Sequence, residues 1–143
     1  MSELVVAARP TAVISATTTW EAYPRLWREL LDEVWRTLRD DPLVRPGRNV
    51  MLYRDDVPNV EVGAEIAGPF SGAGRIVGSA LPAGRVLTTT LRGSYDELAA
   101  AHRAVIDAAA ERGLERPGPR WEIYGHWNES SPEQEVEIYW LVR

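Results

Sequence analysis

The sequence contains no cysteine, and none of its sixteen basic residues is lysine. Without cysteine, the chain forms neither disulfides nor thiolate metal sites and has no cysteine nucleophile. Without lysine, it cannot form a Schiff base with a carbonyl substrate. The exclusive use of arginine is typical of the codon bias of a GC-rich genome. Several kinds of covalent and metal chemistry are therefore excluded.

Long apolar runs are also missing. No stretch approaches the roughly 20 apolar residues that a membrane-spanning helix needs, and no charged segment followed by an apolar one opens the chain. The formal net charge is −5 over 143 residues, which is a poor match for nucleic-acid phosphates. A chain of this length and ordinary composition forms one domain. We expect a cytoplasmic protein that binds a small molecule, with no membrane and no direct nucleic-acid partner.

The two halves of the chain resemble each other in sequence. When residues 17–19 are aligned with 88–90, both segments read Thr-Thr-Thr, and residues 45–47 and 116–118 both read Arg-Pro-Gly. These matches predict an internal duplication, because several matches at the same offset are unlikely to arise by chance. The predicted boundaries are repeat 1 at about 11–67, a linker rich in glycine and proline at 68–82, and repeat 2 at about 83–143.

Each repeat is predicted to contain a strand, a helix and two further strands. Hydrophobic periodicity and turn residues indicate helices near 24–39 and 95–112, and strands near 11–19, 49–54, 59–67, 84–92, 120–127 and 134–142. Pro24 suits a first helical position, and Ser94 with Glu97 forms a capping box. We expect an α+β fold: one antiparallel sheet, both helices on one face, and a ligand groove on the other.

Side chains alternate between the two faces of each strand. The aliphatic sets are expected to face the helices, which leaves a second set that mixes carboxylates with tyrosines: Met51, Tyr53, Glu61, Glu122, Tyr124, Glu137 and Tyr139. Aromatic rings and carboxylates attract organic cations. We predict that these residues line a groove for an aromatic, cationic or electrophilic ligand, with His126 and Trp127 at one end. A solvated polar face, common in antiparallel sheets, is the alternative.

The stretch from LPAGRV through LRGSYDELAAAHRAVIDAAAERGLERPGPRWEIYG to EVEIYWLVR resembles the GyrI-like (gyrase-inhibitor-like) small-molecule-binding family. This family includes the effector-binding domains of bacterial multidrug-responsive transcription activators. The resemblance is strongest over about 84–143 and implies two modules related by a pseudo-twofold axis. It also implies that Glu137 lies at the groove centre, with Tyr124 and Tyr139 beside it. Since a helix-turn-helix domain has no room here, we expect no self-contained transcription factor.

The sequence does not contain the motifs of nucleotide-binding, metal-binding or serine-hydrolase sites. The third glycine of the Gly72, Gly74 and Gly78 series comes one residue too late for a dinucleotide fingerprint, and no P-loop lysine follows. The two histidines lack the spacing of metal ligands, and His102 is predicted to be a core residue of the second helix. No G-x-S-x-G elbow surrounds any serine. We therefore predict no metal and no cofactor.

Three functions remain open. The first is a stand-alone protein that binds hydrophobic, often cationic, xenobiotics or antibiotics. The second follows from the resemblance, because some stand-alone relatives are hydrolases that open the cyclopropane ring of DNA-alkylating natural products. Here Glu137 would be the general base, and Tyr124 or Tyr139 would donate to a developing oxyanion. The third is an interaction module for a partner protein, such as a gyrase inhibitor. We favour binding, because the sequence itself shows no water-activating dyad.

Overall fold

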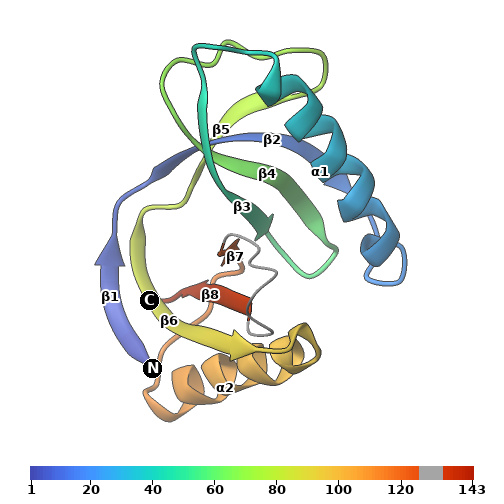
Figure 1. Ribbon diagram of the computed structural model, residues 1–143. Coiled ribbons are helices and arrows are strands. Elements are labelled where there is room, and N and C mark those ends of the chain that lie inside the picture. Colours follow the sequence, from blue (N-terminus) through green and yellow to red (C-terminus); the bar gives the residue numbers. More distant parts are fainter. Residues whose placement is uncertain (126–133) are drawn as a thin grey trace.

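The computed structural model describes residues 1–125 and 134–143. One antiparallel sheet has the strand order β1-β6-β8-β7-β3-β4-β2-β5, and two α-helices pack against it (Figure 1). The elements are β1 (Ser2–Val6), β2 (Arg9–Thr17), α1 (Tyr23–Arg39), β3 (Arg45–Tyr53), β4 (Asn59–Ala67), β5 (Val77–Leu81), β6 (Gly84–Gly93), the 3₁₀ turn η1 (Tyr95–Glu97), α2 (Leu98–Glu111), β7 (Arg120–Tyr124) and β8 (Gln134–Leu141). The predicted α+β class is confirmed.

The first helix begins within one residue of its predicted start, whereas the segment predicted as helical from 95 begins as η1 and becomes α-helical only at Leu98. Pro24 occupies the first turn of α1, where its missing N–H has no partner to lose. Ser94 accepts a hydrogen bond from the backbone N–H of Asp96 at 3.2 Å and so caps η1 ahead of α2. Neither helix of the described residues is long and apolar enough to cross a membrane.

Two strands have no counterpart in the prediction. β1 and β5 are the edge strands of the sheet, and β5 lies within the segment predicted as a linker. Both are five residues long and largely exposed. A short strand with little buried surface carries almost no alternating pattern, which is why the sequence did not reveal it.

Both helices lie on the same face of the sheet, as predicted. Directly opposed residues of antiparallel strands point to the same side. Ile138, Glu122, Met51, Val62 and Ile14 are opposed in turn across β8, β7, β3, β4 and β2. α1 packs in one cluster with Val62 and Ile14, and α2 packs in another with Ile138. We call this surface the helix face.

On the other face of the sheet, buried side chains pack together, and no helix of the described part of the chain contributes to them. Their cluster joins residues from strands far apart in the sheet order: Val13, Val50, Leu52, Leu81, Val86, Trp121, Ile123 and Tyr139. Val13 of β2 and Val86 of β6 meet in this cluster, which requires the strong curvature visible in Figure 1. The curved sheet therefore encloses a second core on its own.

The two halves share an element order. A strand, a helix and two strands run from β2 to β4 and again from β6 to β8, and equivalent strands lie at equal distances from the β3–β7 boundary. The internal duplication and its boundaries stay predictions.

Candidate ligand-binding site

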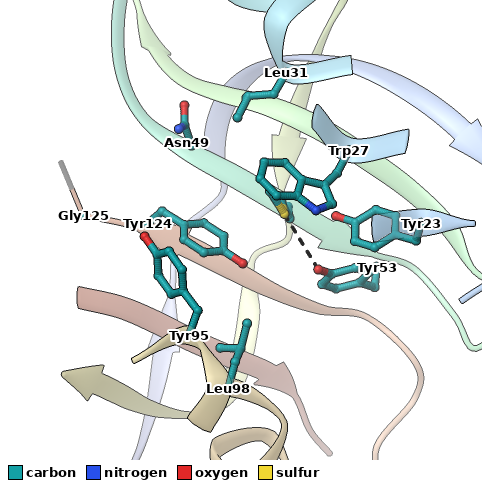
Figure 2. A pocket seen from close by; sticks show the side chains of 10 residues that line it. Tyr23, Trp27, Leu31, Asn49, Tyr53, Tyr95, Leu98, Tyr124 and Gly125 are labelled. Carbon is teal, nitrogen blue, oxygen red and sulfur yellow. Dashed lines mark hydrogen bonds between the residues drawn. The ribbon is translucent and has the colours of Figure 1, made fainter. Parts of the chain in front are cut away.

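A cavity of about 430 Å³ opens between α1 and the start of α2, over β3 and β7 (Figure 2). Its lining is mainly aromatic and apolar: Tyr23, Trp27, Leu31, Asn49, Met51, Tyr53, Tyr95, Leu98, Tyr124 and Gly125. Tyr23, Trp27 and Leu31 are spaced one helical turn apart and therefore share one side of α1. The volume falls within the range of about 300–1,000 Å³ that is usual for small-molecule sites.

A second cavity of about 600 Å³ adjoins the first, because Tyr53 and Leu98 line both. Its remaining lining residues are Trp20, Pro24, Asp56, Ala99, His102, Ile106, Arg116, Arg120, Glu122 and Trp140. We call the two cavities together the interhelical groove. It lies on the helix face, whereas the sequence analysis expected a groove on the opposite face.

Glu122 is the buried carboxylate of this groove. Only 2% of the residue is exposed. The hydroxyls of Tyr53 and Tyr124 donate to its Oε1 at 2.8 Å and 2.7 Å. Nε2 of His102 lies 2.6 Å from its Oε2. Three side chains from β3, β7 and α2 thus hold the carboxylate in one orientation.

The hydrogen bond from Trp140 to His102 indicates which ring nitrogen of His102 carries the proton. The indole Nε1–H of Trp140 donates to Nδ1 of His102 at 2.9 Å, and an indole nitrogen can only donate. Nδ1 is therefore unprotonated, so the proton of the neutral ring is on Nε2 and points at Glu122. The three described hydrogen-bond donors of Glu122 are consequently neutral groups.

No arginine of the described residues forms an ion pair with Glu122, whereas the buried Glu61 and the partly buried Glu65 and Glu137 each have such a partner. Glu61 pairs with Arg54, and Glu65 and Glu137 both pair with Arg48. Within the described chain, the carboxylate of Glu122 is therefore held by hydrogen bonds and is not ion-paired to an arginine, although Arg116 and Arg120 line the same cavity.

The tyrosines of the groove stay protonated at physiological pH. Burial, reinforced by the negative charge of Glu122, raises the pKa of both Tyr53 and Tyr124 well above its ordinary value. Burial also raises the pKa of Tyr23. Their hydroxyls remain hydrogen-bond donors, and the stability that depends on them falls only as the pH rises above 10.0, the ordinary tyrosine value.

Two of the chain's own cations already lie against aromatic rings of the second cavity. The guanidinium of Arg116 lies 5.4 Å from the ring centre of Trp140. The guanidinium of Arg120 lies 5.5 Å from the ring centre of Trp20 and 4.9 Å from that of Trp140. Arg120 also pairs with Asp56 at 2.8 Å, so its charge is balanced without Glu122. This compartment therefore shows the cation–π geometry that a ligand cation would use.

The residues predicted as one site are divided between two faces. Met51, Tyr53, Tyr124 and Glu122 line the groove. The other three, Glu61, Glu137 and Tyr139, lie on the opposite face, because Leu52 opposes Glu61, Ile123 opposes Glu137 and Trp121 opposes Tyr139. The alternation within each strand is correct. The register between strands decides which sets share a face, and a shift of one residue exchanges them.

Glu137 has a different environment from the one the resemblance implied. It forms an ion pair with Arg48 and accepts a hydrogen bond from Tyr139 at 2.5 Å. Burial and this contact raise the pKa of Tyr139 to about 12. Glu61 likewise accepts from Ser79 at 2.6 Å in addition to its ion pair with Arg54. These carboxylates are neutralised by arginines and do not line the groove.

His126 and Trp127, predicted at one end of the groove, lie outside the described residues. Within 1–125 and 134–143, no group of three or more histidine, aspartate and glutamate side chains is placed to hold a metal ion.

The sequence analysis missed the helical side of the groove. The first cavity is lined by Tyr23 and Trp27 of α1 and by Tyr95 of η1. The second cavity is lined by His102 of α2, which also hydrogen-bonds to Glu122. The sequence does contain a sign of this lining, because Tyr23 and Trp27 add aromatic rings to the apolar side of the first helix. Such a stripe is read as core unless the position of the second helix is known.

Comparison with known proteins identifies the fold and family. A model of the GyrI-like small molecule binding domain matches residues 1–143. Among solved structures, the C-terminal domain of EcmrR has a TM-score of 0.81 at 19% identity, covering 99% of this chain and 96% of that one. SAV2435 bound to tetraphenylphosphonium has a TM-score of 0.74 at 13% identity, covering 99% and 93%. A hydrolase from Listeria innocua has a TM-score of 0.63 at 10% identity, covering 99% and 91%. No curated protein matches the chain.

Proposed function

The chain belongs to the GyrI-like small-molecule-binding domain family, and on that basis we propose that it binds hydrophobic aromatic cations, such as xenobiotics or antibiotics, in the interhelical groove. One observation carries this proposal. Glu122 is buried beneath aromatic rings, and its described hydrogen-bond donors are all neutral.

Electrostatics explains why a cation fits. A buried charge without an opposite charge is costly, and three hydrogen bonds compensate only part of the lost hydration. A ligand cation near Glu122 supplies the missing charge. Each aromatic ring that faces the cation adds about 0.5–2 kcal/mol. The relative SAV2435, whose structure is described as bound to tetraphenylphosphonium, supports the same class of ligand.

We expect the groove to distinguish ligands by charge at constant shape. Tetraphenylphosphonium and tetraphenylborate have nearly the same size and opposite charges, so they form a suitable pair. The cation should bind at least roughly tenfold more tightly, a difference of about 1.4 kcal/mol. Tryptophan fluorescence reports binding, because Trp20 and Trp27 line the groove. Equal or tighter binding of the borate would remove the electrostatic basis of the proposal.

A second candidate, hydrolysis of cyclopropane-bearing electrophiles, has one observation in its favour. Glu122 lies beside the hydroxyls of Tyr53 and Tyr124. In such a reaction, water attacks a ring carbon and gives a proton to a carboxylate. The ring C–C bond breaks, and its electron pair moves through the conjugated system to a carbonyl oxygen, to which a hydroxyl donates. In this second candidate, Glu122 would be the general base in place of Glu137, which the sequence analysis proposed.

Mass spectrometry separates the two candidates. Hydrolysis converts the parent compound into a product heavier by one water, whereas binding leaves the compound unchanged. The third hypothesis, a protein-interaction module, stays a prediction.

A further inference from the structure

The hydroxyl of Tyr23 has no hydrogen-bond partner among residues 1–125 and 134–143. Among the side-chain nitrogen and oxygen atoms that are buried in the described residues, it is the one without a partner. Tyr23 is 7% exposed and lines the first cavity of the interhelical groove. Its ring packs edge-to-face on Tyr53, with 5.3 Å between ring centres, so the ring is held in place.

An unpaired buried hydroxyl destabilises a folded protein, because it has lost its hydrogen bonds to water and gained none in return. Phenylalanine would fill the same space without that cost. Burial raises the pKa of Tyr23, so the hydroxyl carries its proton and is available as a donor. Figure 2 shows this hydroxyl on the side of the ring that faces Trp27 and the cavity between the labelled rings.

Asn49 adds a second donor to the same cavity. Its Oδ1 accepts the indole N–H of Trp35 at 2.6 Å, and the indole fixes the orientation of the amide because it can only donate. The amide nitrogen of Asn49 is therefore directed away from Trp35 and has no hydrogen-bond acceptor among the described residues. Asn49 also lines the first cavity.

We propose that the first cavity recognises a hydrogen-bond acceptor on the ligand, such as a carbonyl oxygen, through the hydroxyl of Tyr23. The ligand class is then an aromatic cation that carries an acceptor some distance from its charge. This inference rests on the proposed function, since the same groove binds the cation. Tyr23 is thus a specificity-determining residue: it distinguishes cations that pair with its hydroxyl from those that do not.

Two phosphonium probes test this proposal. (4-Acetylphenyl)triphenylphosphonium carries a carbonyl oxygen, and (4-isopropenylphenyl)triphenylphosphonium has a methylene group in its place and nearly the same shape. The wild type should bind the acetyl probe roughly 5- to 10-fold more tightly, as expected for one net hydrogen bond. Tyr23→Phe should abolish this preference by weakening the acetyl probe alone.

Each outcome of this experiment is informative. Equal affinity of the wild type for both probes, or an unchanged preference in Tyr23→Phe, overturns the acceptor site. Glu122→Gln reports separately on the proposed function, because it should weaken both cations and leave their ratio intact. If neither cation binds the wild type, both proposals are wrong.

Thermal unfolding of the ligand-free protein supplies a readout that a merely structural tyrosine would not give. Tyr23→Phe removes a group that has no partner, so the midpoint should rise by about 3 °C. A fall in the midpoint would show that the hydroxyl has a partner in the free protein and would overturn the proposal.

Discussion

Replacing Glu122 with glutamine is expected to lower the affinity for tetraphenylphosphonium by roughly 30-fold or more, which corresponds to about 2 kcal/mol. Glutamine keeps the shape of the side chain and removes its negative charge. The bound cation then lies in an aromatic groove without a counter-charge, and only the cation–π contacts remain. Isothermal titration calorimetry of the wild type and the variant measures the difference. Tetraphenylborate, titrated in parallel, should bind the variant no more weakly than the wild type if the groove is intact.

Glu137→Gln is the matched control. Glu137 undergoes the same chemical change on the opposite face, where Arg48 already neutralises it. We expect its affinity for tetraphenylphosphonium to stay within about twofold of the wild type, because solvent and distance screen a charge outside the groove. A loss in Glu137→Gln equal to or larger than that in Glu122→Gln would move the site to the opposite face.

Trp121→Ala should destabilise the protein by about 3–5 kcal/mol, the usual cost of removing a buried tryptophan side chain. Trp121 is 2% exposed and stacks on Tyr139 with 5.6 Å between ring centres. No helix of residues 1–125 and 134–143 covers this face, so the stack and its aliphatic neighbours fill the inside of the curved sheet. Truncation leaves a cavity that the strands cannot close without changing their curvature. Urea denaturation followed by circular dichroism gives the change in the free energy of unfolding.

Leu43→Ala serves as the control for this prediction. Leu43 is 67% exposed, and its truncation should change stability by less than about 1 kcal/mol. Trp121→Ala should also retain its affinity for tetraphenylphosphonium under conditions where it is folded, because Trp121 does not line the groove. If Trp121→Ala costs no more than Leu43→Ala, the helix-free face is not a second core.

The sequence predicts the elements well where the pattern is long. α1 and α2 each have a continuous apolar stripe, and the central strands have clear alternation, so their positions follow from local periodicity. The edge strands β1 and β5 bury little surface, and their pairing with β6 and β2 depends on the folded sheet. Long-range pairing of this kind leaves no signal in a short segment.

The candidate site is predictable in part, and its limits have one physical cause. Met51, Tyr53, Glu122 and Tyr124 follow from alternation and from the unusual mixture of carboxylates with tyrosines. The assignment of Glu137 to the same surface requires the register between β7 and β8, in which Glu137 opposes Ile123 and not Glu122. Because both sets on these strands contain large buried residues, hydrophobicity alone cannot distinguish the two faces.

The hydrogen-bond network of Glu122 also lies beyond what a sequence shows. His102 is on the apolar stripe of α2, and the sequence analysis treated it as core. In the structure, it connects Trp140 to Glu122 through its two ring nitrogens. This role depends on the approach of α2 to β7 and β8, which no spacing within α2 encodes.

The most direct test of this account is a crystal structure of the protein with tetraphenylphosphonium. The account predicts that the cation lies between α1 and α2, with aromatic rings of the groove within about 6 Å of it and Glu122 as its nearest carboxylate. A cation bound on the opposite face, against Glu61 or Glu137, would contradict the account and restore the surface that strand alternation alone predicts.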